Sequence, residues 1–155
     1  MVHLPLHSDK QIGQYCSLVD KNPHIYDMAN LDLLAMLKAY DAMDETNEIQ
    51  RKNILLYAEN LNEWLRISET ASDKKVMHFV NMCQIMKRQN KLTEEYFDEL
   101  HNLLSDETVD SIMKVGISLI LGERETFEHW VALCKDVEME NMRRYPIWNF
   151  YTKLN

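Results

Sequence analysis

Glycine and proline are scarce in this sequence, with three of each among 155 residues. A β-protein of this length needs many turns, and turns concentrate glycine, proline, asparagine and aspartate. The three prolines, Pro5, Pro23 and Pro146, lie near the chain ends, so most of the interior contains no residue that breaks a helix. The sequence therefore predicts an all-α fold.

Cysteines and long apolar runs are few as well. Cys16, Cys83 and Cys134 are an odd number, lie far apart and form no Cys-x-x-Cys pair, which argues against a disulfide framework. We expect them to be buried thiols. No stretch reaches the ~18 apolar residues of a membrane span, and residues 1–10 lack the pattern of a signal peptide. These absences predict a cytoplasmic protein without membrane association.

What the sequence does contain is helical periodicity. Apolar residues recur three and four positions apart, as they do on one face of a helix. One such stripe is expected at Leu31, Leu34 and Leu37, together with the Met36/Tyr40 pair, and another at Ile54, Ala58, Leu61 and Leu65. We expect seven helices, over residues 8–20, 28–43, 48–67, 73–90, 93–104, 105–121 and a last segment that buries Phe127, Trp130, Val131 and Cys134.

Cap and stop signals set these boundaries. Asn22 precedes Pro23 and avoids helical geometry, so the first helix ends there. Thr93 is a favourable N-cap for the fifth helix, and Ser105 for the sixth. The sixth helix is the most apolar and is expected at the centre, with Gly122 as its C-terminal stop.

The length and composition suit one domain with one hydrophobic core. Hydrophobic residues make up 46% and charged residues 27%, which is ordinary for a globular protein. Short connections make neighbouring helices mostly antiparallel. We predict a single all-α domain over 1–155, a helical bundle or an irregular stack of helical hairpins, with a short lead (1–7) and an aromatic tail (145–155).

Residues 106–146 resemble a degenerate tetratricopeptide-type helical hairpin. The run Ile-Ser-Leu-Ile-Leu-Gly at 117–122 leads into the polar turn 123–125, and Pro146 ends the unit. The second half carries Phe127, Val131 and Cys134. In that family a Leu-Gly-like turn joins two helices that interlock through small or aromatic side chains. The resemblance implies a protein-binding scaffold.

Arg124 and His129 form an Arg-x-x-x-x-His motif just after Gly122. This motif resembles that of the HEPN ribonucleases, small all-α proteins that usually dimerise. The resemblance implies that Arg124 and His129 act on an RNA phosphate and the attacking 2′-hydroxyl. Residues five apart lie about 140° apart around a helix, and Glu125 and Glu128 add charge that repels phosphate. The other interpretation is a surface arginine paired with glutamate and a partly buried histidine.

The sequence gives little support for a metal site or a phosphate-binding loop. Asp98 and His101 have the one-turn spacing of a carboxylate–histidine ligand pair, but no second pair of this kind accompanies them. The sequence contains no glycine-rich phosphate loop, no Gly-x-Ser-x-Gly elbow and no His-Glu-x-x-His. We expect no metal and no cofactor.

Charge is segregated along the chain, whose net charge of −8 argues against direct nucleic-acid binding. Seven acids and no Lys or Arg occupy positions 94 to 110: Glu94, Glu95, Asp98, Glu99, Asp106, Glu107 and Asp110. They predict either an acidic face for a basic partner or a solvated face beside the preceding basic helix.

The tail is rich in aromatic residues, namely Tyr145, Trp148, Phe150 and Tyr151. We expect them to fold back as a lid on the helices or to form an exposed anchor, since Trp and Tyr dominate binding hot spots.

These features favour a non-enzymatic protein–protein interaction or regulatory domain whose partner is another protein. The expected binding residues are the seven acids with Trp148 and Tyr151. One alternative is a HEPN-like ribonuclease, in which Arg124 and His129 share a cleft at a two-fold interface. Another is an acidic inhibitor that occupies a nucleic-acid-binding site. The ribonuclease alternative predicts a homodimer, whereas a dimer without another partner would weaken the interaction hypothesis.

Overall fold

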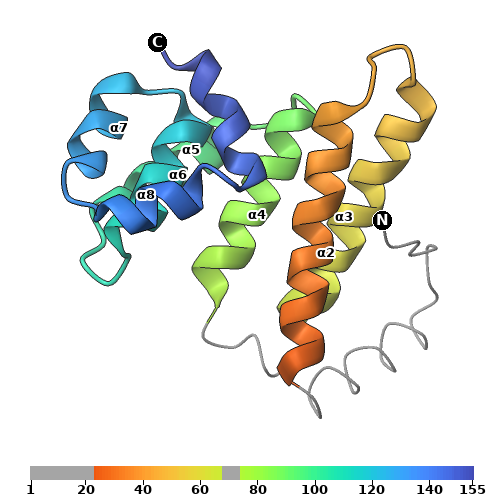
Figure 1. Cartoon of the computed structure of the whole chain (residues 1–155), viewed down its shortest axis with the longest axis horizontal. Coiled ribbons are helices and arrows are strands. Elements are labelled where there is room, and N and C mark those ends of the chain that lie inside the picture. The colour runs from red at the N-terminus through yellow and green to blue at the C-terminus, as the bar shows by residue number, and fades with distance from the viewer. Residues whose placement is uncertain (1–22, 68–73) are drawn as a thin grey trace. The chain divides into compact units, whose positions relative to one another are not determined.

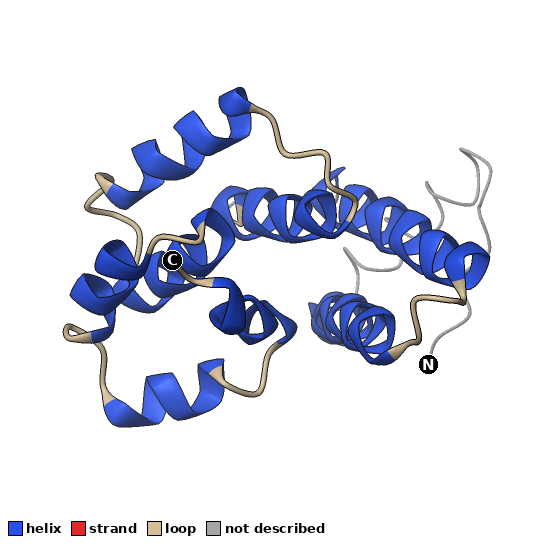
Figure 2. Ribbon diagram, turned by 90° about the horizontal axis from the view of Figure 1, so that it is seen from above, coloured by secondary structure: helices blue, strands red, loops and turns tan. Residues whose placement is uncertain are grey.

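The computed structural model describes residues 23–67 and 74–155, and every regular element in these ranges is a helix (Figure 1, Figure 2). The all-α fold is therefore confirmed. The predicted helix over 8–20, together with Cys16, lies outside the described residues. The elements are α2 (Pro23–Ala42), α3 (Glu48–Ile67), α4 (Lys75–Arg88), α5 (Glu94–Leu104), α6 (Ser111–Leu121), α7 (Arg124–Val131), α8 (Asp136–Met142) and the 3-10 helix η2 (Pro146–Lys153).

The chain forms two compact units, which divide after Ile85 near the end of α4. Unit 1 precedes this point and unit 2 follows it. Each has its own helix packing. The expectation that the whole chain is one domain stays a prediction.

Unit 1 is built on the packing of α2 against α3. The predicted stripe of α3, namely Ile54, Ala58, Leu61 and Leu65, is buried, and Trp64 is buried with it. Helix α3 also begins and ends at the predicted residues, Glu48 and Ile67. Here the periodicity of the sequence and the packing agree fully.

Helix α2 differs from its prediction in its start and in its buried face. It begins at Pro23 rather than at residue 28. The N–H of the first helical residue makes no hydrogen bond within the helix, so proline loses nothing there, and its fixed φ suits the helix. The buried residues are Ala29, Leu33, Met36 and Leu37, whereas Leu31 is exposed. Three residues advance about 300°, so the predicted Leu31-to-Leu37 series drifts across the helix by about 60° at each step.

Unit 2 is arranged around α6. Helices α5, α7, α8 and η2 all pack against it, and Figure 1 shows α6 among them. All of residues 114–120 are buried, as the nearly continuous apolar sequence requires. The predicted central position of this helix is confirmed.

The predicted start of α6 at Ser105 is wrong. The helix begins at Ser111, after an N-cap at Asp110. In the intervening turn the Asp106 carboxylate accepts hydrogen bonds from the Thr108 main-chain N–H at 2.8 Å and from its hydroxyl at 2.6 Å. Such local bonds from aspartate to the backbone compete with helix formation.

The predicted seventh helix is two helices. Helix α7 ends at Val131, and α8 begins at Asp136 after an N-cap at Lys135, whose main-chain N–H donates to the Glu138 carboxylate at 3.0 Å. Of the four side chains expected to be buried here, Phe127 is buried, whereas Trp130, Val131 and Cys134 are only half-buried.

Gly122 ends α6 as predicted, in the left-handed conformation with φ of 72°. Its N–H donates to the carbonyls of Ser118 and Leu119, and the N–H of Glu123 donates to Ser118 as well. These bonds satisfy carbonyls that a helix end otherwise leaves unpaired.

Replacing Gly122 with alanine is expected to destabilise unit 2 by about 1–2 kcal/mol, because a Cβ is strained in this conformation. Gly122→Asn should lose less, since asparagine tolerates positive φ better. Urea unfolding followed by circular dichroism measures both. Equal losses for the two variants would contradict a backbone origin of the effect.

Candidate partner-binding surface

Arg124 and His129 are both exposed on α7, at its start and near its end. The Arg124 Nε donates to the main-chain oxygen of Asn155 at 2.9 Å. The His129 ring packs edge-on against Trp130, with ring centroids 4.8 Å apart. The two side chains thus have different partners, and none of their contacts joins them.

The His101 side chain pairs with Glu123. It does not join Asp98 in the carboxylate–histidine pair that a metal site would need. Its Nε2 lies 2.8 Å from the Glu123 carboxylate, and its Nδ1 lies 2.8 Å from the carbonyl oxygen of Phe97. Both neighbours are acceptors, so the arrangement suits the doubly protonated ring, and the bond to Glu123 raises the pKa of His101. The pair ties α5 to the start of α7. Within 23–67 and 74–155, no three His, Cys, Asp or Glu side chains are grouped to hold a metal ion.

The described cysteines differ in their surroundings. Cys83 is buried, and its burial raises the pKa of the thiol to about 12. Cys134 is half-buried, so the prediction of full burial is wrong for it, because the helix that was to enclose it ends at Val131. Burial and then the charge of Glu138 raise its pKa too. Neither thiol has the lowered pKa of a reactive cysteine.

The seven acids predicted as binding residues lie on α5 and on the turn before α6. All are exposed except Asp106, which is half-buried and bonded to Thr108. Glu94 and Glu95 occupy the first turn of α5, where the helix dipole favours negative charge. The structure therefore places these carboxylates at the surface. Two of them, Glu94 and Glu95, also stabilise the start of α5.

The aromatic tail forms η2, whose 3-10 geometry explains its contacts. Residues three apart are eclipsed in such a helix, so Trp148 and Tyr151 stack face to face, with ring centroids 4.8 Å apart and planes 8° apart. The buried ring of Phe127 from α7 lies against both, at 5.8 Å and 5.5 Å. Ile147 and Phe150 make up the other face and are buried. Ile147 and Phe150 therefore fold back onto the helices of unit 2, as the expected lid does, whereas the use of the exposed side chains as a binding anchor stays a prediction.

Three cations lie over aromatic rings of η2. The Arg143 guanidinium lies over the Trp148 ring, 5.7 Å from its centroid. On the buried face, Lys87 and Arg88 lie over the Phe150 ring at 5.1 Å and 4.6 Å. Burial, and then the charge of Lys153, lower the pKa of Lys87.

Lys87 and Arg88 also donate hydrogen bonds to main-chain carbonyls of α6 and η2. The Lys87 ammonium donates to the Ile120 carbonyl at 2.7 Å, and the Arg88 guanidinium donates to the Pro146 carbonyl at 3.0 Å. The sequence predicts these residues only as basic ends of α4, since nothing in it connects them with a ring some 60 residues later. The contacts fix the position of η2.

We define the tail surface as Arg143, Tyr145, Trp148, Tyr151 and Lys153. Tyr145 is 44% exposed and Tyr151 is 38% exposed, while Trp148 is half-buried between its neighbours. Arg143 and Lys153 are exposed as well. The surface therefore presents ordered aromatic rings with the Arg143 guanidinium over one of them, and Lys153 lies at the end of the same 3-10 helix.

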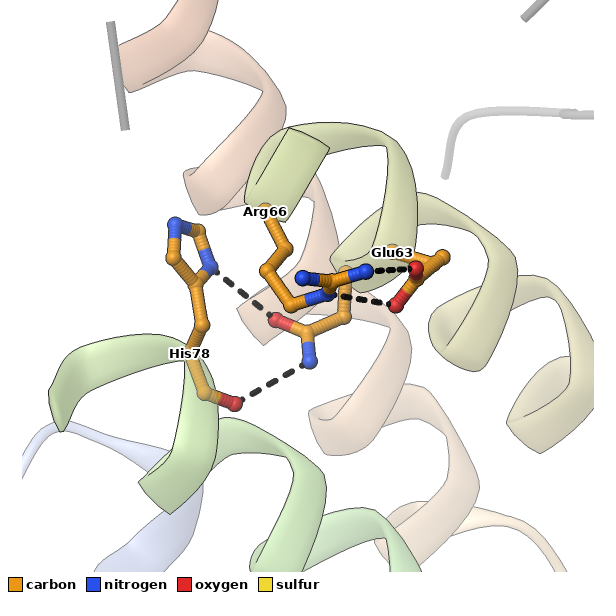
Figure 3. Close-up of polar contacts among 4 residues, drawn as sticks. Glu63, Arg66 and His78 are labelled. Atoms are coloured by element: carbon orange, nitrogen blue, oxygen red, sulfur yellow. Dashed lines mark hydrogen bonds and ion pairs between the residues drawn. The ribbon is translucent and has the colours of Figure 1, made fainter. Parts of the chain in front are cut away.

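A second polar cluster lies inside unit 1 (Figure 3). The Asn62 amide donates to the His78 carbonyl at 3.1 Å, and its oxygen lies 3.4 Å from the His78 Nδ1. Glu63 and Arg66, an exposed ion pair on α3, lie nearby. His78 is only 2% exposed, and burial, followed by the charges of Arg66 and Lys74, lowers its pKa. The cluster ties α3 to α4 and offers no open site.

Unit 1 is expected to lose stability as the pH falls from 7 to 5. Because the folded-state pKa of His78 is below the ordinary 6.5, its contribution is complete above about pH 6.5 and is lost as the pH falls through the folded pKa. His78→Gln should flatten this loss in urea unfolding. His101→Gln acts instead in unit 2, which should then lose more stability at low pH than the wild type, since the raised pKa of His101 stabilises this unit below about pH 6.5. Parallel profiles for both variants and the wild type would contradict these assignments.

No helix within the described residues is both long and apolar enough to cross a membrane.

Comparisons with known proteins give no relative. No family model matches the chain, and neither a curated protein nor a solved structure matches it.

Proposed function

We propose that this chain is a non-enzymatic protein-interaction domain that binds a partner protein through the tail surface. The stacked and partly exposed Trp148–Tyr151 pair carries the proposal. Tryptophan, tyrosine and arginine are the residues most enriched in binding hot spots. All three occur here within a few residues of one another.

The order of these side chains supports the same function. Phe127 lies against both rings, and Arg143 lies over one of them. Side chains that are already ordered lose little conformational entropy when a partner binds. Burial of an exposed tyrosine face against a partner then contributes almost fully to affinity.

The exposed acids of residues 94–110 are a second expected contact region, suited to a basic segment of the same partner. The odd number and wide separation of the three cysteines support a cytoplasmic setting. The contacts of Arg124 with Asn155 and of His129 with Trp130 give the ribonuclease hypothesis no support.

Capture of a partner from native lysate, with the purified wild type and variants as bait, tests the proposal. Tyr151→Ala should weaken retention of a stoichiometric partner by about 30-fold, since an aromatic hot spot contributes about 2 kcal/mol. Ile49→Ala removes a 78% exposed side chain far from the tail in sequence and serves as control. A partner held equally by wild type and Tyr151→Ala would overturn the tail surface as the binding site.

A further inference from the structure

The tail has a charge opposite to that of the chain as a whole. From Arg143 to Asn155 there are three cations, Arg143, Arg144 and Lys153, and no Asp or Glu, whereas the chain carries a net charge of −8. All three cations are exposed. Three of the chain's 17 Lys and Arg residues therefore lie in the segment that carries the stacked rings, where they attract carboxylates.

The local carboxylates leave this charge largely available. Arg144 pairs with Glu140 at 3.6 Å, but the two side chains are 71% and 67% exposed, so this pair is weak and easily exchanged. Burial and, second, the positive charge of Lys153 lower the pKa of Lys87. An incoming anion would be attracted by both cations.

Arg143 is placed to bind a carboxylate with both of its terminal nitrogens. Its guanidinium lies over the Trp148 ring, and a guanidinium that packs on an aromatic face keeps its N–H groups at the edge directed outward. Fork-shaped pairing with a planar carboxylate is stronger than pairing with a single ammonium.

The same rings are poorly arranged for nucleic acid. Single-stranded binding relies on aromatic faces on which bases stack, but the Trp148 ring already carries Tyr151 and Arg143. The net charge of −8 also repels a phosphate backbone. A peptide needs only one or two carboxylates and an apolar side chain, which this surface can accept.

We propose, on the basis of the function proposed above, that the tail surface binds an acidic segment of the partner protein. Carboxylates of that segment pair with Arg143 and Lys153, and its apolar side chains lie against the exposed part of Tyr151.

The direct test titrates the full-length chain with a fluorescein-labelled peptide of alternating Glu and Leu, measured by fluorescence anisotropy. A Lys–Leu peptide and an oligouridine of equal length are run beside it. We expect the acidic peptide alone to bind, with affinity that falls as salt rises. The double variant Arg143→Glu/Lys153→Glu should bind it at least about tenfold more weakly. Lys91→Glu/Lys135→Glu changes the net charge equally at two exposed lysines outside the tail surface and should bind like the wild type.

Several results would overturn this inference: no binding of the acidic peptide, equal binding by both double variants, or preferred binding of the oligouridine. A wild-type dimer in light scattering that the Arg143→Glu/Lys153→Glu variant abolishes would also overturn it, because the acidic ligand would then be a second copy of this chain. Lysate capture separates the two proposals. A partner lost with Tyr151→Ala but retained by the double reversal refutes the acidic ligand and leaves the proposed function standing.

Discussion

Replacing Trp64 with alanine is expected to lower the free energy of unfolding of unit 1 by about 3–5 kcal/mol, the usual loss for a large buried aromatic. Trp64 is 2% exposed and belongs to the core that α2 and α3 form with Leu33, Leu37 and Leu61. Removal of the indole leaves a cavity between two helices that the rigid neighbours fill only partly. Urea unfolding followed by circular dichroism at 222 nm measures the change.

Ile49→Ala is the matched control, because Ile49 lies on the same helix and is 78% exposed. Its effect should stay within about 0.5 kcal/mol. Trp64→Phe keeps part of the volume and should lie between the two. If Trp64→Ala and Ile49→Ala lost similar stability, Trp64 could not be part of a packed core.

Local periodicity in the sequence predicts the bounds and the buried residues of a helix correctly where one face of that helix packs against one neighbour. The bounds of α3 and its stripe of Ile54, Ala58, Leu61 and Leu65 follow from spacing alone. The stop at Gly122 does too, because only a residue that tolerates positive φ closes a helix in this way. These features depend on backbone sterics and on apolar burial, both of which a single sequence displays.

Other boundaries depend on competition between similar local signals. Ser105 and Asp110 are both good N-caps, and the structure uses the second because Asp106 bonds to Thr108 within the turn. The break between α7 and α8 has no proline or glycine to mark it. The buried bond between Asn62 and the His78 main chain joins residues 16 apart, so neither residue alone signals it.

The candidate surface was predictable in part. The aromatic residues of the tail were evident, but their stacking requires η2 to be a 3-10 helix, where residues three apart are eclipsed. Lys87 and Arg88 were expected only to favour the C-terminal end of α4. Their contacts with Phe150 and with the carbonyls of Ile120 and Pro146 are long-range, and helical periodicity carries no information about them.

Phe150→Ala is expected to destabilise unit 2 by about 3–5 kcal/mol and to release η2 from α6. Phe150 is 5% exposed, and its ring contacts the two cations that also hold η2 and α6 through their carbonyl bonds. Without the ring, Lys87 and Arg88 would face a cavity, and a partly buried charge beside a cavity gains by drawing in water. Hydrogen exchange should therefore speed up in residues 146–153 before it does in α6.

The same variant tests whether the tail surface depends on this anchor. Trp148 and Tyr151 lie about 120° from Phe150 around the 3-10 helix η2, so Phe150→Ala removes none of the proposed contacts and alters only their support. We expect it to weaken partner capture as strongly as Tyr151→Ala, whereas Phe150→Leu, which keeps most of the buried volume, should retain capture. Undiminished capture by Phe150→Ala would mean that the surface rings are ordered by Phe127 and Arg143 alone. If η2 exchanged rapidly yet the partner stayed bound, the partner could not recognise the Trp148–Tyr151 pair in its stacked form.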